Sequence, residues 1–108
     1  MRHEGDAVRL RHVIDAAEKA VTFVAGRSRS DLSSDEMLGL ALVRLLEVIG
    51  EAAKNVSEST RAEYPNVQWR AIASTRDRLI HGYFDVDMDV VWGIVTEDLP
   101  RLLAQLRQ

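Results

Sequence analysis

The segment from about Ser33 to Val56 constrains the fold more than any other part of the chain. Leucine, isoleucine, valine, methionine and alanine recur through it at helical spacing and cover more than one stripe of the helix surface. A helix this apolar either lies at the centre of a bundle or is buried on a second side by another chain. In a chain of 108 residues the second arrangement is attractive, so we expect a symmetric dimer.

The rest of the chain also favours an all-helical fold. Residues 7–25 place apolar groups on one stripe, and residues 69–80 continue another stripe that Gly82 should end. A short turn of helix is expected over residues 58–63. Pro100 should kink or split the last helix near Asp98, because proline lacks the backbone N–H that a helix needs.

Side chains typical of helix starts precede three of these segments. Ser33 and Glu36 have the spacing of a capping box, and Asn66 can cap the helix that follows it. Asp85 or Asp87 can cap the last helix.

The chain as a whole, residues 1–108, is expected to form one helical domain. It has no cysteine, which excludes a disulfide framework, a thiolate zinc site and a cysteine nucleophile, and is compatible with a reducing cytosol. No apolar run approaches the roughly 18 to 20 residues of a membrane span, and we expect a soluble, cytoplasmic protein.

The charges are unevenly distributed along the chain. The net charge of −3 argues against coating of nucleic acid by bulk electrostatics. Residues 59–84 nevertheless carry four basic and two acidic groups, the most basic balance in the chain. A dimer that brought two such segments together could hold a polyanion.

Two glutamates and a glycine in the apolar segment from Ser33 to Val56 can each be explained by function or by structure alone. Glu47 and Glu51, four residues apart, could be an acid and base pair or part of a metal site, or they could flank the core and pair with arginines such as Arg44 or Arg76. Gly50 between them either lets two backbones approach closely or merely weakens the helix.

Two of the histidines and both tryptophans are interpreted as residues without a role in chemistry. His3 and His12 lack a partner at metal-ligand spacing and are interpreted as solvated surface residues. Trp69 and Trp92 are interpreted as core or interface residues in preference to stacking platforms for bases.

The stretch from Arg76 to Tyr83 carries the side chains best suited to chemistry. The planar guanidinium of Arg76 matches a phosphate, and His81 can accept and return a proton near neutral pH. Together they suffice for RNA cleavage by attack of the substrate's own 2′-hydroxyl, which needs no metal and rejects DNA. Tyr83 could orient substrate or be a modification site.

The same stretch has a plainer explanation. A histidine or tyrosine at a helix C-terminus is favoured by the helix dipole alone. Five residue steps also place His81 roughly 140° around a continuous helix from Arg76. The two side chains could then converge only if the helix unwinds at Gly82, or form a composite cleft if helix ends of two chains meet.

The pattern Arg-x4-His-x-Tyr, formed by Arg76, His81 and Tyr83 with Asp77 after the arginine, resembles the HEPN superfamily. More narrowly it is similar to the HepT-like toxins of HEPN/MNT toxin-antitoxin pairs. Three further elements occur in the order expected for that family: residues 45–53, the approach from Pro65 through Trp69 to Ile72, and the Val91-Trp92 and Leu99-Pro100 pairs. The resemblance covers nearly the whole chain, from about Val8 to Leu106.

The resemblance implies an up-and-down four-helix bundle that forms a homodimer, with the Arg-x4-His motifs in a cleft between protomers. It implies a metal-independent endoribonuclease toxin without a cofactor, in which Arg76 and His81 are the catalytic pair and Asp77 supports the site. It also implies a nucleotidyltransferase antitoxin that modifies Tyr83 with AMP groups, whose phosphates would block the cleft.

Two further interpretations stay open. Arg78 is an extra cation within the motif, assigned either to RNA backbone contact or to a solvated surface role. The alternative function is a catalytically silent helical binding module that docks a nucleotidyltransferase or binds nucleotides, with Arg76 holding a ligand phosphate and His81 serving the structure.

Overall fold

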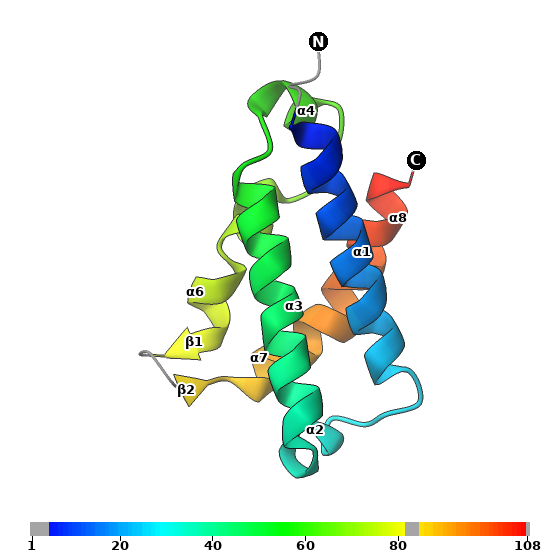
Figure 1. Cartoon of the computed structure of the whole chain (residues 1–108), viewed down its shortest axis with the longest axis vertical. Coiled ribbons are helices and arrows are strands. Elements are labelled where there is room, and N and C mark those ends of the chain that lie inside the picture. Colours follow the sequence, from blue (N-terminus) through cyan, green and yellow to red (C-terminus); the bar gives the residue numbers. More distant parts are fainter. Residues whose placement is uncertain (1–4, 82–84, 108) are drawn as a thin grey trace.

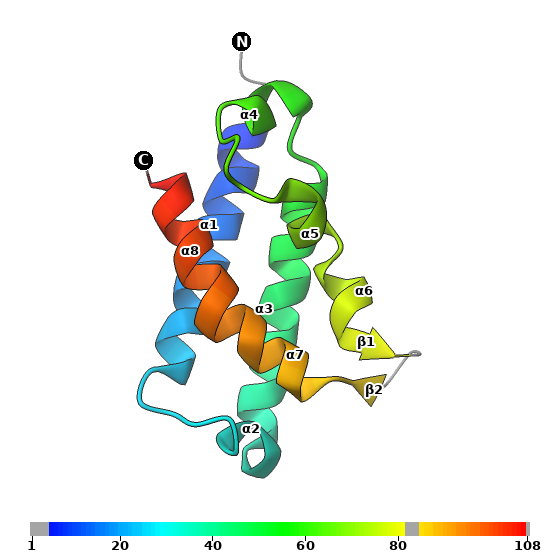
Figure 2. The ribbon, with the colours of Figure 1, turned by 180° about the vertical axis from the view of Figure 1, so that it is seen from behind.

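Within the described residues, four helical columns run alternately up and down the long axis of the molecule (Figures 1 and 2). The computed structural model describes residues 5–81 and 85–107, and His81 by its backbone alone. The columns are α1 (Asp6–Val24), α3 (Glu36–Lys54), α5 (Trp69–Ala73) with α6 (Thr75–Leu79), and α7 (Met88–Gly93) with the π-helical η1 (Ile94–Asp98) and α8 (Leu99–Leu106). Short helices α2 (Asp31–Ser34) and α4 (Glu58–Ala62) lie near opposite ends of the bundle. The predicted all-α bundle is confirmed.

The central column is α3, which packs against α1 on one side and against α5 and α6 on the other. Its core-facing residues recur every three or four positions and are buried: Leu38, Leu42, Leu46, Ile49 and Ala53. The N-terminal half of α3 also carries apolar side chains away from the core, since Met37 is 82% exposed and Leu40 is 61% exposed. The prediction that this helix is apolar on more than its core side is therefore correct.

The helix starts only partly follow the predicted caps. The Asp35 carboxylate, not Ser33, caps α3 by accepting from the Leu38 backbone N–H at 3.1 Å. Ser33 lies inside α2, a four-residue helix that ends directly before Asp35, so its hydroxyl is not at the helix start. Asp87 does cap α7, as predicted.

The predicted cap at Asn66 was wrong. The helix begins later than expected, and α5 follows Gln68, whose side chain makes no capping hydrogen bond. The segment before it turns instead through backbone bonds, with the N–H of Val67 donating to the carbonyl of Tyr64 at 3.1 Å.

Pro100 splits the last column, as its position predicted. The chain widens into the π-helical η1 directly before Leu99, and α8 then begins with Pro100 in its first turn. Proline has no N–H for the carbonyl four residues back and its ring clashes with it, and a wider turn relieves both problems. The hydroxyl of Thr96 donates to the carbonyl of Trp92 at 2.7 Å within this turn.

The helix predicted to continue from Trp69 to Gly82 is the main error. It breaks at Ser74, where the Thr75 hydroxyl donates to the carbonyl of Ile72 at 2.7 Å. It ends at Leu79, whose carbonyl accepts from the N–H of Asp87 at 2.7 Å. The carbonyl of Leu79 is therefore bonded to the residue that precedes α7, in place of a further turn of α6.

Two short strands follow this helix end. They are β1 (Ile80–His81) and β2 (Asp85–Val86), paired antiparallel with Ile80 opposite Val86 and His81 opposite Asp85. β-Branched residues suit an extended backbone, and the pairing gives Ile80 and Val86 that conformation. Residues 82–84, including Gly82 and Tyr83, lie outside the described residues.

The core confirms the structural reading of the tryptophans. Trp69 is buried, and its indole N–H donates to the carbonyl of Tyr64 at 3.3 Å, while Trp92 packs half-buried against the core. His12 is exposed on α1, as predicted, and His3 lies outside the described residues. None of the helices in the described part of the chain is long and apolar enough to cross a bilayer.

Candidate active site

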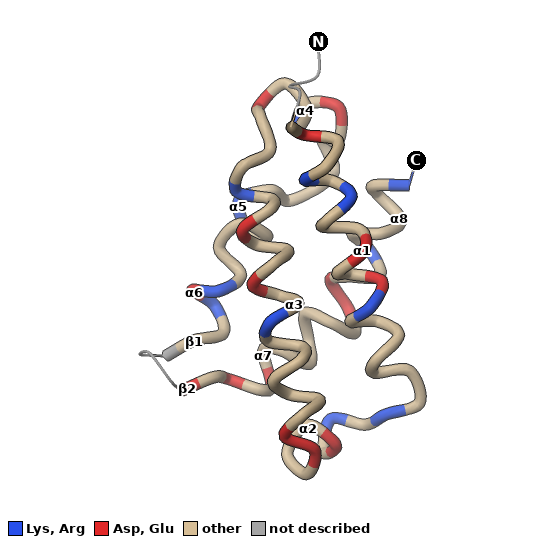
Figure 3. The backbone as a smooth tube through the Cα atoms, in the orientation of Figure 1, with Lys and Arg blue, Asp and Glu red and all other residues tan. Residues whose placement is uncertain are grey.

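A polar groove with a volume of about 560 Å³ lies between α3 and the α5–α6 column. We call it the α3–α6 groove. Its lining comes from α3 on one side and from the turn between α5 and α6 on the other: Arg44, Glu47, Gly50, Glu51, Lys54, Ala73, Ser74, Arg76 and Asp77. Figure 3 shows charges of both signs along α3 and α6. A groove with this mixture presents cations to a ligand phosphate and carboxylates that can orient those cations.

Arg76 is the cation that α6 contributes to this groove. Its Nε atom lies 3.4 Å from Oε2 of Glu47, and 68% of its side chain is exposed against 30% for Glu47. The prediction that Glu47 pairs with an arginine is therefore confirmed. Because most of the Arg76 side chain is in contact with solvent, it is accessible to a ligand without rearrangement of the core.

Gly50 explains why the two helices come close enough for this pair. A Cβ atom at this position would lie 3.3 Å from the carbonyl oxygen of Ile72 and 3.7 Å from that of Ala73. The contact with Ile72 is tighter than most side chains accept, so α3 meets the end of α5 backbone against backbone. Of the two explanations for Gly50, close approach is the correct one.

The motif residues separate onto two sides of α6. Asp77 lines the α3–α6 groove beside Arg76. Arg78 forms an ion pair with Asp98 of η1, at 3.5 Å between Nη2 and Oδ2, and lines a second pocket of about 270 Å³ on the other side of α6. Two helical steps turn a side chain by about 200°, which accounts for the separation.

His81 follows Arg76 by five residues but does not share its helix. Its backbone pairs with Asp85 in the short strand pair, which extends from the end of α6 away from the bundle axis (Figure 1). The expected angle of 140° assumed a continuous helix and therefore does not apply. Tyr83 and the His81 side chain lie outside the described residues, so their distances from Arg76 are not part of this geometry.

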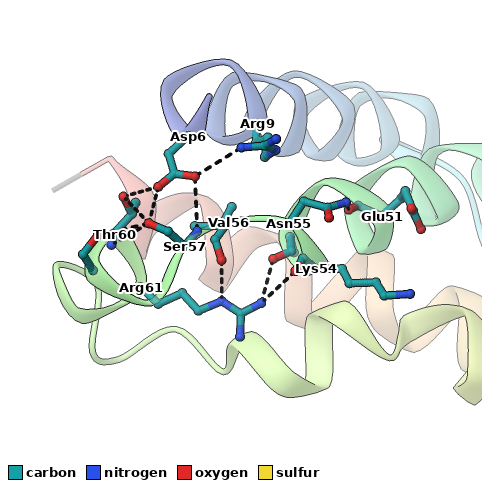
Figure 4. A network of polar contacts seen from close by, with 11 residues as sticks. Asp6, Arg9, Glu51, Lys54, Asn55, Val56, Ser57, Thr60 and Arg61 are labelled. Carbon is teal, nitrogen blue, oxygen red and sulfur yellow. Dashed lines mark hydrogen bonds and ion pairs between the residues drawn. The ribbon is translucent and has the colours of Figure 1, made fainter. Parts of the chain in front are cut away.

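A second polar cluster, which sequence patterns did not predict, closes the end of the bundle where α1 begins and α3 ends (Figure 4). The carboxylate of Asp6 is fully buried and accepts from the Ser57 hydroxyl at 2.5 Å, the Thr60 hydroxyl at 2.5 Å and the Ser57 N–H at 3.2 Å. Arg61 donates to the carbonyls of Ala53 at 2.9 Å and Val56 at 3.1 Å. We call Asp6, Ser57, Thr60 and Arg61 the cap network.

The cap network holds α1, α4 and the end of α3 together. Arg61 satisfies carbonyls at the C-terminus of α3 and also lies 5.8 Å from the ring centre of Trp69. An aspartate in the first turn of a helix is an ordinary surface pattern. The partners of Asp6, Ser57 and Thr60, lie 51 and 54 residues away, so nothing in the local spacing of residues could have identified the network.

Among the side chains that the structure describes, in residues 5–80 and 85–107, no three histidines, aspartates or glutamates are grouped as metal ligands would be. In particular, Glu47 contacts Arg76, and Glu51 lies one turn further along α3. The described geometry of Glu47 fits the arginine-pairing reading, whereas Glu51 forms no ion pair among the described side chains.

Comparison with known proteins identifies relatives along almost the whole chain. The family model described as "Ribonuclease HepT-like" matches residues 13–108. A Thermococcus cleftensis protein named "Probable ribonuclease HepT" is 39% identical over 99 residues, which cover 92% of this chain and 90% of that protein. A Caldanaerobacter subterraneus protein named "Putative RNase TTE0752" is 37% identical over 99 residues, covering 92% and 88% respectively. No solved structure matches the chain significantly.

Proposed function

The chain belongs to the HepT-like ribonuclease family, and from this premise we propose that it is a metal-independent endoribonuclease, the toxin of a HEPN/MNT toxin-antitoxin pair. The observation that carries the proposal is Arg76 in the α3–α6 groove, exposed and accessible to a phosphate, five residues before His81. The names of the relatives support the ribonuclease reaction, and the groove supports Arg76 as its phosphate-binding group.

The proposed reaction uses only groups of the protein and the RNA. The substrate's 2′-oxygen attacks the adjacent phosphorus, and the bond from phosphorus to the 5′-oxygen breaks, leaving a 2′,3′-cyclic phosphate and a free 5′-hydroxyl. His81 transfers the proton taken from the 2′-hydroxyl or given to the 5′-oxygen. Arg76 stabilises the added negative charge on phosphorus, and Asp77 supports the site from the same groove.

We also propose that the active form is a homodimer with the cleft between protomers. The support is the face of α3 on which Met37 and Leu40 are exposed, since large apolar side chains that are 82% and 61% exposed are typical of a surface that another chain covers. Arg44, one turn from Leu40, lines the α3–α6 groove, so this apolar face and the groove adjoin. A partner on this face would lie next to Arg76.

Control of the enzyme is assigned to Tyr83 and to a nucleotidyltransferase antitoxin of the MNT type. AMP groups added to the phenol would add negative phosphates to the proposed cleft and repel RNA. Co-expression with such a partner is expected to add AMP mass to the wild-type protein and none to Tyr83→Phe. The same mass gain on co-expression in both proteins, or no gain in either, would exclude this mode of control.

The central test is RNA cleavage by purified protein in the presence of EDTA. Wild type is expected to cut RNA, to leave a DNA strand of the same sequence intact, and to yield cyclic phosphate ends. His81→Ala is expected to lose activity by at least about 100-fold, the usual contribution of a general acid or base. Equal activity in wild type and His81→Ala, or no cleavage by either, would remove the proposed function.

A further inference from the structure

Glu47 and Glu51 form a natural comparison, because both line the α3–α6 groove from the same helix, one turn apart. In the described residues only Glu47 forms an ion pair with Arg76, at 3.4 Å between Oε2 and Nε. Glu47 is half-buried, whereas Glu51 is exposed. The two carboxylates therefore share a charge and a groove and differ in their contact with Arg76.

The contact reaches Arg76 through its Nε atom. A guanidinium carries five N–H donors on a planar fork, and a phosphate is bound bidentately by two of them. A carboxylate at Nε leaves the edge formed by the two terminal nitrogens for a phosphate. The ion pair and phosphate binding are thus compatible in one arginine.

Arg76 gains from such a contact because most of its side chain lies in solvent. Its side chain is 68% exposed and extends from a helix of five residues, α6. A long exposed side chain loses rotamer freedom when it binds a ligand, and a contact that restricts it beforehand reduces that loss. The close approach of the two helices at Gly50 supplies a fixed point on α3 from which Glu47 can restrict Arg76.

We propose that Glu47 is a positioning residue that holds the guanidinium of Arg76 by its Nε edge, so that the two terminal nitrogens face the RNA phosphate. This rests on the proposed function, in which Arg76 stabilises charge on that phosphate. Glu47 acts through Arg76 and touches no substrate. Its own charge also repels RNA, so loss of the carboxylate has two effects of opposite sign: tighter RNA binding and slower chemistry.

The matched variants Glu47→Gln and Glu51→Gln separate these effects, because each removes one negative charge from the groove at nearly constant side-chain size. Both are expected to lower KM for RNA by about twofold to threefold, the size of an exposed charge effect. Only Glu47→Gln is expected to lower kcat, by about fivefold to tenfold, because only it releases Arg76. Equal kcat values for the two variants overturn the proposal.

A second variant keeps the negative charge and shortens the side chain that carries it. Glu47→Asp shortens the side chain by one methylene, so it is expected to lower kcat while KM stays at the wild-type value. An unchanged kcat in Glu47→Asp contradicts positioning. Thermal unfolding of all three variants establishes that they keep the fold of the wild type.

A spectroscopic readout distinguishes failure of this inference from failure of the proposed function. The Nε–Hε resonance of Arg76 in a ¹H–¹⁵N spectrum is assigned by its absence in Arg76→Lys, and it requires no cleavage. Glu47→Gln is expected to shift this resonance, and Glu51→Gln to leave it in place. If wild type cuts no RNA, the proposed function fails, while a resonance with the same position in both variants overturns the contact itself.

Discussion

The carboxylates of Asp6 and Glu47 both have an arginine within ion-pair distance, yet their surroundings are opposite in kind. Asp6 is fully buried in the cap network and accepts three hydrogen bonds from Ser57 and Thr60, with Arg9 at 3.5 Å. Among the described residues, Glu47 forms an ion pair with Arg76 at 3.4 Å, in an open groove. The same residue chemistry thus serves two purposes in two neighbouring parts of one bundle.

The difference follows from the cost of removing a charge from water. A buried carboxylate is tolerated only when several hydrogen-bond donors replace the water molecules that would hydrate it. Those buried donors in turn need the carboxylate as their acceptor. An exposed pair contributes little to folding, roughly 0–1 kcal/mol, and can exchange partners when a ligand arrives. We therefore expect substitutions in the cap network to change stability, and substitutions in the α3–α6 groove to change activity.

The largest expected effect is on RNA cleavage by Arg76→Ala. Loss of the guanidinium removes the group that stabilises the transition state, and activity should fall by at least about 100-fold with little change in unfolding temperature. Arg78→Ala, from the same helix but paired with Asp98 on its other side, should retain activity within about threefold. A comparable loss in both variants would mean that RNA contacts both sides of α6.

The reciprocal experiment is Asp6→Ala in the cap network. It leaves the Ser57 hydroxyl and N–H and the Thr60 hydroxyl without their acceptor, and should lower the free energy of unfolding by about 2–3 kcal/mol. Urea unfolding measures this change. Asp15→Ala, which removes an exposed carboxylate from the same helix, should stay within about 0.5 kcal/mol of wild type. Similar losses of unfolding free energy in both variants would show that the buried Asp6 carboxylate contributes no more to stability than an exposed one.

The apolar end of α3 gives an intermediate effect, on association. Leu40→Asp should raise the dissociation constant of the proposed dimer at least about tenfold, since it replaces a covered leucine by a charge. Sedimentation over a range of concentrations measures the constant. Val8→Asp, on the exposed part of α1 near the other end of the molecule, serves as the matched substitution and should leave it unchanged. A wild-type protein that stays monomeric would exclude the dimer.

The smallest expected effect is a change in stability when a methyl group is added at Gly93 or at Gly50, which lines the α3–α6 groove. Gly93→Ala should stabilise the protein by about 0.5–1 kcal/mol, the usual helical gain, because nothing lies within 4 Å of the added methyl group. Gly50→Ala should bring no gain, because its methyl group meets the carbonyl of Ile72 at 3.3 Å. Thermal unfolding compares the two. Equal stabilisation would show that the approach of α3 to α5 is not tight.

Local patterns were sufficient wherever a structural feature depends on neighbours in the chain. The apolar spacing of residues 7–25 predicted α1, Asp87 was a correct choice for a cap, and Pro100 splits the last column where a missing N–H requires it. The end of α6 was missed because backbone pairing with Asp85, Val86 and Asp87 determines it, and apolar spacing carries no signal of that pairing. The N–H of Asp87 binds the carbonyl of Leu79 eight residues earlier, and the strand pair replaces the expected helical turn.

The sequence by itself determined the helical columns and the apolar residues that α3 carries on more than its core side, because spacing along the chain sets which face a side chain occupies. It also determined that Arg76, Asp77 and His81 belong to one motif. Only the tertiary structure decided which contacts those side chains make. It paired Arg76 with Glu47 of α3, turned Arg78 to the opposite side of α6, and enclosed Asp6 among partners more than 50 residues away. Such contacts depend on how closely helices pack, as at Gly50, which no single segment encodes.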